Sequence, residues 1–543
     1  MSPRSASLVR VVAAAVFLGF ALRSAFVIDD AFISFRYASN WAEWGEPVYN
    51  RGEFVEGYSN FLWVFLLRVL AELGVALPAA ATWISLACAL ATVALVEHHL
   101  RRDLKLAPAA SAAGVFLLAC FPPFQVWATG GLESAAHALL LFATYRLLAA
   151  PGDDRKLGLL AGLSGLGLVL IRVEGVAWLG AALVGAWFAG RCHGPGSGRP
   201  RFGVRALACL APALLGFAVF LAWRHATYGE WLANTAAAKG GTNAAVWARG
   251  LRTIASYALL FVTPLVALLA IPLATSPRRL AAVGASAVFA AFLLFNAVVG
   301  GDWMPMFRLL APASPFVAVL VALALERAGR GLVPLAATLA AVQLLPAFDV
   351  HLLPHSLRDA LYFRTFRVGY ETEWERWSRS VENGEAFERM GRALAVAGEP
   401  TDSITLGPIG AVGFYSGLHI LDRNGLVEPS VAGLEVELGT KTAGHDRRVP
   451  RAFFLDREPT YFEVLLWPGP MTADRWPGFQ EAARGMAAFV FSDPAERALQ
   501  ERCVVEELEL PGDGEFAGTH VLVLRRVEDP AVARSFWASL LPR

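Results

Sequence analysis

Long apolar runs recur through the first two-thirds of the chain, and they constrain its fold more than any other feature. Several approach the roughly 20 helical residues needed to cross about 30 Å of hydrocarbon. The runs are roughly Leu8–Ile28, Ser59–Leu77, Ala79–His99, Pro108–Phe121, Glu133–Ala149, Leu157–Ile171, Val176–Gly190, Val204–Trp223, Ala255–Ala274, Leu280–Val299, Leu309–Leu325 and Gly331–Phe348. This pattern predicts a polytopic α-helical membrane protein, with the lipid bilayer as its surroundings.

Composition agrees with a membrane protein and excludes several function classes. Of the 543 residues, 56% are hydrophobic and 17% are charged, whereas about a quarter would be charged in a soluble protein. The net charge is +1 and no basic stripe dominates a segment, which argues against nucleic acid as a partner. The five cysteines have no metal or redox spacing, and the common nucleotide-binding and hydrolase motifs are absent from the sequence.

The charge of the connections predicts which side of the membrane each one faces. Basic connections favour the cytoplasm, and arginines before the first run place the start of the chain inside. The loop 29–58 has six acids against Arg36 and Arg51, so we expect it outside, together with the C-terminal region. Starting inside and ending outside requires an odd number of crossings. We therefore expect about eleven, with the stretch 59–99 containing a re-entrant or paired segment.

The C-terminal region changes character near residue 350. A polar helical stretch, 371–397, precedes short β-like runs at 402–407, 419–422, 461–466, 487–492 and 519–527. Alternating helices and strands predict a small α/β domain. The expected organisation is a transmembrane domain, 1–349, followed by a soluble extracytoplasmic domain, 350–543.

Two adjacent acids, Asp29 and Asp30, stand where the first apolar run ends. Successive helical residues point about 100° apart, so the two carboxylates are not expected to share one target. One of them can cap the amphipathic aromatic helix expected over Ala31–Trp44. A cap would explain the presence of one acid but not of the other. Acids at the edge of the hydrocarbon layer are candidates for a functional role by default.

Other charged side chains stand at the ends of apolar runs. Glu133 occurs in "ATGGLESAAH", and Arg172 and Glu174 occur in "IRVEGVAW". For the last two, an internal ion pair is at least as good an explanation as a ligand contact.

A further group of polar residues lies in segments predicted to be external. In "VVGGDWMPMFRLLAP", two glycines precede Asp302 and Trp303, and Arg308 follows about one turn later. Glycines allow the backbone to turn sharply and to approach a ligand. Lys239 is one of four lysines against 43 arginines. This bias is a weak indication of anion binding, and an ordinary surface charge remains the favoured alternative.

The segment "DDAFISFRYASNWAEWGEPVYNRGEFVEGYSNFLW" resembles the first external loop of the GT-C superfamily of membrane glycosyltransferases. Within that superfamily, the chain is most similar to the mycobacterial terminal arabinofuranosyltransferases and their bacterial relatives. The likeness extends to "GGLES", "RVEG", "YGEWLANTAAAKG" and "GGDWMPMFRLLAP", and in the C-terminal region to "GAVGFYSGLHILDRNGLVEP" and "GHDRRVPRAFFLDREP".

This resemblance implies transfer of a sugar from a polyprenyl-phosphate donor to a cell-envelope saccharide acceptor outside a bacterial inner membrane, with inversion. It implies that Asp29 or Asp30 is the general base, and the sequence slightly favours Asp29. The further candidates for contact with substrate or lipid phosphate are Arg36, Glu56, Tyr58, Glu133, Arg172, Glu174, Lys239, Asp302, Trp303, Arg308, His445 and Arg447.

Two other functions remain open at the level of sequence. A transporter or flippase of lipid-linked saccharides would also place charges inside the bundle, but it predicts internal repeats, and none is visible in the sequence. Alternatively, the C-terminal domain is a glycan-binding module that the bundle anchors. No cofactor is expected. A divalent metal is possible but no ligand cluster indicates one.

Overall fold

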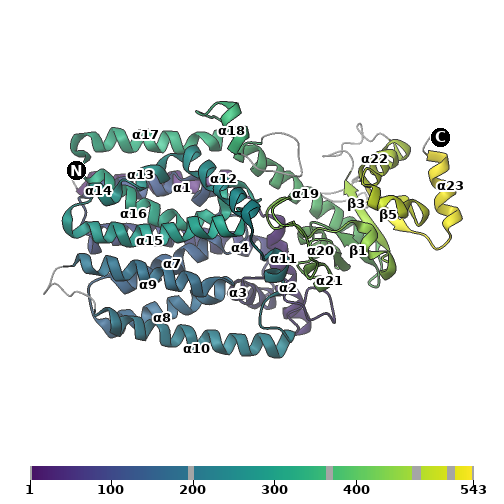
Figure 1. Cartoon of the computed structure of the whole chain (residues 1–543), viewed down its shortest axis with the longest axis horizontal. Helices are drawn as coiled ribbons and strands as arrows, with labels where there is room; N and C mark the ends of the chain where they lie inside the picture. Colours follow the sequence, from purple (N-terminus) through teal and green to yellow (C-terminus); the bar gives the residue numbers. More distant parts are fainter. Residues whose placement is uncertain (1–2, 194–200, 362–370, 467–477, 510–519, 541–543) are drawn as a thin grey trace.

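The computed structural model describes residues 3–193, 201–361, 371–466, 478–509 and 520–540. Figure 1 shows a bundle of long helices with a small α/β domain at one end, and the chain begins at the opposite end of the bundle. The predicted division at residue 350 falls between the 3₁₀ helix η5 (Leu345–Phe348) and helix α18 (His355–Leu361).

The bundle consists of apolar helices joined by short connections. Its longer helices are α1 (Pro3–Arg23), α4 (Leu77–His98), α5 (Pro108–Ala119), α7 (Ser134–Ala149), α8 (Asp154–Ile171), α9 (Gly175–Ala189), α10 (Phe202–Tyr228), α12 (Ala244–Phe261), α15 (Ser276–Val299), α16 (Ser314–Leu325) and α17 (Leu332–Leu344). Shorter helices are α6 (Pro122–Val126), α13 (Thr263–Ala267), α14 (Ala270–Leu273) and the 3₁₀ helix η3 (Pro305–Ala313).

Several of these helices have the length and composition of membrane spans. In the described part of the chain, five stretches are long and apolar enough to cross a bilayer: Leu77–Asp103, Gly175–Cys192, Phe202–Tyr228, Pro277–Val299 and Pro305–Gly329. Shorter apolar helices cover Val11–Arg23, Pro108–Ala119, Ser134–Ala149 and Leu332–Phe348. The protein is therefore a multi-pass membrane protein, and the count of eleven crossings stays a prediction.

The stretch 59–99 folds into one short and one long helix. Helix α3 (Phe61–Glu72) has 12 residues, and at about 1.5 Å per residue it is only about 18 Å long. This length is too short for a full crossing of about 30 Å. Helix α5 (Pro108–Ala119) is equally short, so the origin of the odd number of crossings in this stretch stays a prediction.

Helix α2 (Asp29–Trp44) follows α1 and lies at the end of the bundle next to the domain (Figure 1). Its Trp41 ring stacks on Trp223 with 5.6 Å between ring centroids, and Phe61 lies 4.5 Å from Phe220 by the same measure. Trp and Tyr concentrate at membrane–water boundaries, so these rings indicate that α2 lies near the boundary.

The small domain is a five-stranded sheet with the order β2-β1-β3-β5-β4. The strands are β1 (Ser403–Leu406), β2 (His419–Asp422), β3 (Tyr461–Leu466), β4 (Cys503–Glu509) and β5 (His520–Arg526). Strand β1 pairs in parallel with β2 and β3, whereas β5 runs antiparallel to β3 and β4. Helices α19 (Glu373–Ala397), α20 (Gly410–Ser416), α21 (Pro429–Ala432), α22 (Phe479–Phe491) and α23 (Pro530–Leu540) surround the sheet.

One strand prediction was wrong and one strand was missed. Residues 487–492 were expected to form a strand, but 487–491 belong to α22, whose buried positions Ala482, Ala483, Met486, Ala487 and Val490 recur at helical spacing. The missed strand, β4, has the sequence CVVEELE, and its acidic residues conceal the apolar alternation. Residue 519, at the start of the last predicted strand, lies outside the described residues.

Candidate functional site

Two cavities lie where the bundle meets the small domain. The first, which we call the bundle cavity, has a volume of about 290 Å³. Residues from α2, the turn between α8 and α9, helix α11 (Asn234–Lys239) and the segment after α15 line it. Its polar lining includes Asp30, Ser34, Tyr58, Asn60, Glu133, Arg172, Glu174, Thr235, Lys239, Asp302 and Arg308, and its apolar lining includes Ile33, Leu132, Phe295, Val299 and Leu309.

The second, which we call the domain cavity, has a volume of about 250 Å³. One wall is a face of α19, and another consists of the segments that follow the carboxyl ends of β1 and β2. Such ends of parallel strands are common places for ligands in α/β folds. The polar lining comprises Asp29, Asp30, Lys239, Arg376, Arg379, Ser380, Asn383, Asn424, His445 and Arg448.

The two cavities share part of their walls. Asp30, Ile33, Lys239, Trp303, Leu426 and Gly444 line both of them. One acid and one cation therefore stand where a ligand held by the bundle and a ligand held by the domain would meet.

The structure separates the two adjacent acids. Asp29 is 8% exposed, and its two carboxylate oxygens accept hydrogen bonds from the backbone N–H groups of Gly410 and Ala411, at 3.1 and 2.7 Å. Asp30 is less buried and lines both cavities. The expected side-chain cap is wrong: α2 begins at Asp29 itself, after Ile28, and no side chain caps it.

A network of polar side chains forms one wall of the bundle cavity. Arg172 donates hydrogen bonds of 2.5 Å to both Glu133 and Glu174. Asn60 donates to the second oxygen of Glu133 at 2.8 Å and to the Ser34 hydroxyl at 3.1 Å. The guanidinium charge of Arg172 is therefore compensated within the protein, as the ion-pair alternative proposed from the sequence predicted.

The Gly300–Arg308 segment forms a second wall. Arg308 Nε lies 2.9 Å from Asp302 Oδ2, so this cation is also paired. Gly300 and Gly301 have φ angles of 79° and 84°, a region that favours glycine. The glycines turn the chain so that Asp302 and Trp303 face the cavities.

Lys239 stands at the end of α11 and has no hydrogen-bond or ion-pair partner among the described residues. Its side chain keeps exposed surface although protein surrounds it, because it faces the two cavities. Burial lowers the pKa of Lys239, and the nearby Asp30 opposes that shift. Arg447 Nη1 donates to the carbonyl oxygens of Ala238 and Gly240, both at 3.0 Å, and so holds the backbone on either side of Lys239.

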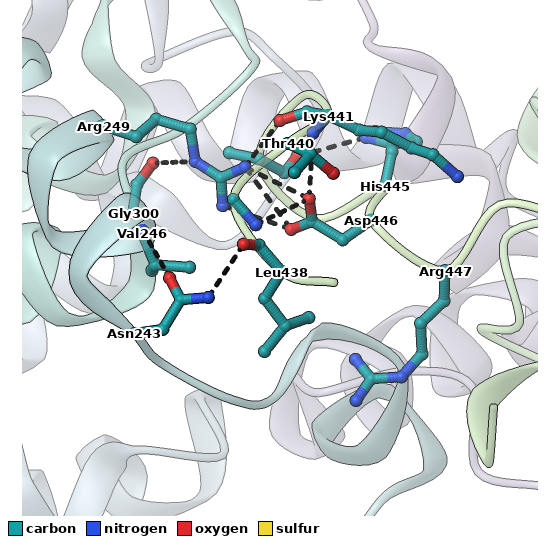
Figure 2. Close-up of polar contacts among 12 residues, drawn as sticks. Asn243, Val246, Arg249, Gly300, Leu438, Thr440, Lys441, His445, Asp446 and Arg447 are labelled. Carbon is teal, nitrogen blue, oxygen red and sulfur yellow. Dashed lines mark hydrogen bonds and ion pairs between the residues drawn. The ribbon is translucent and has the colours of Figure 1, made fainter. Parts of the chain in front are cut away.

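The loop 438–446 of the small domain closes over the cavities. Figure 2 shows Arg249 of α12 reaching this loop: it lies 3.3 Å from Asp446 and donates to the carbonyl oxygens of Lys441 and Gly300. Asp446 in turn accepts the backbone N–H groups of Gly439 and Lys441. Arg249 therefore connects the loop that carries His445 to the glycine segment of the bundle.

His445 lines the domain cavity with its ring close to Trp303. Its Nδ1 lies 3.1 Å from the carbonyl oxygen of Ala443. Burial and the charge of Lys239 lower the pKa of His445, which keeps the imidazole neutral at neutral pH.

Three predicted site residues do not line either cavity. Arg36 donates to the backbone oxygens of Tyr49, Gly413 and Leu418, and thus joins the external loop to the domain. Glu56 pairs with Arg224 at 2.6 Å, and burial raises the pKa of Glu56 to about 7. The third, Arg447, supports the segment around Lys239.

Sequence reasoning missed part of the site. Arg376, Arg379, Ser380 and Asn383 recur on one face of α19, and their spacing at helical intervals was the available signal. Asn424 and Arg448 were not missed: they come from loops of the small domain within "GAVGFYSGLHILDRNGLVEP" and "GHDRRVPRAFFLDREP", which the resemblance indicated, and Arg448 was a candidate together with Arg447.

Metal binding has no clear structural candidate. Within the described ranges, His, Cys, Asp and Glu side chains form no group of three or more that could hold a metal ion. The expectation of a site without metal or cofactor stays a prediction.

Comparisons of sequence find similarity in two parts of the chain. Residues 371–508 match a family model described as a domain of unknown function (DUF8728). The terminal beta-(1->2)-arabinofuranosyltransferase of Mycobacterium tuberculosis (strain ATCC 25618 / H37Rv) is 27% identical over 352 residues, covering 56% of this chain and 54% of the relative. The chain thus matches about half the length of that relative.

Comparison of structures finds the same fold in ArnT from Cupriavidus metallidurans. The form bound to undecaprenyl phosphate has a TM-score of 0.55 at 13% identity, covering 97% of this chain and 99% of ArnT. The apo form has a TM-score of 0.52 at 13% identity, covering 78% and 87%. The resemblance predicted from the motifs is confirmed: this chain has the fold of ArnT, a GT-C glycosyltransferase, and resembles a terminal arabinofuranosyltransferase in sequence.

Proposed function

We propose that this protein is an integral-membrane glycosyltransferase that moves a sugar from a polyprenyl-phosphate donor to a saccharide acceptor. The observation that carries this proposal is the pair of cavities that share Asp30 and Lys239. A glycosyltransferase brings a donor and an acceptor together, and two adjoining cavities that share an acid and a cation suit that arrangement. A path for transport would need only a single continuous cavity.

The bundle cavity suits the donor. Its apolar side chains, such as Leu132, Phe295 and Leu309, fit an isoprenoid chain, and its polar side chains fit a sugar phosphate. ArnT, which has the same fold, was solved with undecaprenyl phosphate bound. Because Arg172 and Arg308 are already paired with acids, Lys239 is the cation that would offset the phosphate charge.

The domain cavity suits the acceptor. Its lining includes side chains that are able to form several hydrogen bonds each, among them Ser380, Asn383 and Asn424. Such groups can form hydrogen bonds with the hydroxyls of a saccharide and so select it. The acceptor hydroxyl would then reach the shared wall from the side opposite the donor phosphate.

In this arrangement Asp30 acts as the general base. It takes the proton of the acceptor hydroxyl while that oxygen forms a bond to the anomeric carbon of the donor sugar. The bond between this carbon and the phosphate oxygen breaks, and its electron pair leaves with the lipid phosphate beside Lys239. Attack from the face opposite the leaving group inverts the anomeric configuration.

We place this site outside a bacterial inner membrane. The acidic loop 29–58 is joined to the small domain, so the two lie on one side, and the basic connections lie toward the other end of the bundle. A long lipid tail explains why the cavities lie at the membrane boundary.

The test is transfer of a labelled sugar from polyprenyl phosphate in membranes that contain the full chain. Asp30→Asn is expected to lower kcat about 10²- to 10⁴-fold, the usual loss when a positioned base is removed. Asp359→Asn, at an exposed position of α18, is the matched control and should keep wild-type activity. Full activity of Asp30→Asn would exclude this assignment. Translocation without formation of a glycosidic bond would instead favour a flippase.

A further inference from the structure

Asp29 joins helix α2 of the bundle to helix α20 of the small domain. Both oxygens of its carboxylate accept backbone N–H groups from residues more than 380 positions away, Gly410 at 3.1 Å and Ala411 at 2.7 Å. The side chain is almost fully buried. A carboxylate that accepts hydrogen bonds from two buried N–H groups makes a strong and directional contact with them.

The contact continues along α2 into the loop that follows it, and from α20 into strand β2. Arg36, two turns further along α2, donates to the carbonyl oxygens of Gly413 at 2.5 Å and Leu418 at 2.7 Å. Asn50 exchanges two hydrogen bonds with the backbone of Ile420, at 2.9 and 3.0 Å. We call this set of contacts the α2–α20 joint.

The joint depends on a glycine where the helices approach most closely. A Cβ atom on Gly410 would lie 1.8 Å from the carbonyl oxygen of Asp29 and 2.7 Å from its carboxyl carbon. Neither distance is possible for real atoms. Any larger residue at position 410 must therefore push α20 away from α2.

The joint fixes the distance between Asp30, the proposed base, and the part of the domain cavity that we call the acceptor wall, the segment Gly407–Ile409. Asp30 directly follows Asp29, and the segment Gly407–Ile409, which lines the domain cavity, directly precedes Gly410. A shift at the joint would move these two parts of the site relative to each other. Misplacing reacting groups by about 1 Å can cost about 100-fold in rate.

Building on the proposed function, we infer that Asp29 is a positioning residue, which holds Asp30 in register with the acceptor wall through the α2–α20 joint. It differs from the base in what it touches. Its carboxylate serves the backbone of the small domain, and the neighbouring carboxylate serves the shared wall of the cavities.

The test is a double-mutant cycle of Asp29→Asn and Gly410→Ala in the full chain. Asn keeps the shape of Asp but can accept only one of the two N–H groups, whereas Ala at 410 forces the helices apart without changing an acid. Each variant is expected to lower kcat about 10- to 100-fold and to leave KM for the donor within about twofold, because the donor lies on the bundle side. The double variant should be no worse than the worse single one.

The controls separate this role from others. Gly433→Ala, where the nearest atom to the new Cβ is 3.4 Å away, should keep wild-type kcat. Asp30→Asn should lose far more activity than Asp29→Asn. The inference is overturned if Asp29→Asn or Gly410→Ala keeps wild-type kcat, or if Asp29→Asn is as inactive as Asp30→Asn, since Asp29 would then act as the base.

A failure of the proposed function can be distinguished from a failure of this inference. A wild-type protein that transfers no sugar would exclude the glycosyltransferase, whatever the variants do. The joint can then still be examined by thermal unfolding in detergent. At pH 5, Asp29→Asn and Gly410→Ala should each lower the melting temperature, and their effects should not add. If the losses of melting temperature were additive, the two residues would act independently, and the α2–α20 joint would not exist as one unit.

Discussion

At the scale of a single residue, Lys239 is a cation without an ion-pair partner in the described part of the chain, and it faces both cavities. Lys239→Met keeps the length of the side chain but removes its charge. We expect KM for the donor to rise and kcat to fall, about 10- to 100-fold in kcat/KM, since a hydrogen bond to a charged group contributes roughly 1.5–3 kcal/mol. Lys239→Arg should recover part of the loss. Steady-state transfer assays measure both constants.

Lys156→Met is the matched control for this prediction, because Lys156 is an exposed lysine near the start of α8, far from the cavities. Equal activity of the Lys239→Met variant and the wild type would show that no phosphate depends on Lys239.

The carboxyl of Asp29 gives a prediction for pH at the same scale. Burial, together with the neighbouring Asp30, raises the pKa of Asp29 to about 7, although its backbone hydrogen bonds oppose this shift. A raised pKa means that the group's contribution to stability is fully present below about pH 4 and is lost as pH rises through about 7. The wild-type melting temperature, relative to that of Asp29→Asn, should therefore fall by a few degrees between pH 5 and pH 8.

Thermal unfolding in detergent at several pH values measures this difference. The two proteins differ only at the carboxyl of Asp29, so the comparison reports on that group. A difference that stays constant from pH 5 to pH 8 would contradict the raised pKa.

At the scale of an element, the loop 438–446 depends on one buried ion pair between helix α12 and the small domain. Arg249 is 4% exposed and Asp446 is 7% exposed. Arg249→Met would leave the Asp446 carboxylate buried without its partner, which typically costs about 3–5 kcal/mol. We expect a lower melting temperature and a higher KM for the acceptor, because His445 and Gly444 would lose their place in the cavity wall.

Two variants sharpen this test. Arg155→Met removes an exposed arginine near the start of α8 and should change little. The double variant Arg249→Met with Asp446→Asn removes both charges and should recover part of the lost stability. If the single variant were as stable as the wild type, the loop would not depend on this pair.

At the scale of the whole molecule, the end of the bundle that carries α2 and the small domain should lie outside the cytoplasm. Glu43 is exposed on α2, and Lys156 is exposed near the other end of the bundle (Figure 1). In intact cells, a thiol reagent that cannot cross membranes should label Glu43→Cys and spare Lys156→Cys, each in a chain whose own cysteines have been replaced. Labelling of Lys156→Cys alone would show that the protein has the opposite orientation, and it would exclude an extracytoplasmic site.

Much of this architecture could be predicted from local patterns. Apolar runs of spanning length lead to a membrane bundle because backbone polar groups in hydrocarbon must be satisfied within the helix. Strands β1, β2 and β3 were predicted because apolar residues predominate in them, with at most one acid each, whereas β4 was missed because three of its seven residues are glutamates. The cavity-lining residues that the sequence indicated, such as Arg172 and Asp302, were charges at the ends of apolar runs, where an unpaired charge would be costly.

The sequence by itself therefore determined the class of protein and the neighbourhood of the site, because hydrophobic length and misplaced charge are properties of short segments. Only the tertiary structure distinguishes the surroundings of Asp29 from those of Asp30, and the assignment of Asp30 as the base stays a proposal. The two acids have the same chemistry and adjacent positions, and they differ in what lies opposite each carboxylate: the backbone of Gly410 and Ala411 for one, and the shared cavity wall for the other. Contacts across nearly 400 residues arise from the packing of α20 on α2, which no local pattern encodes.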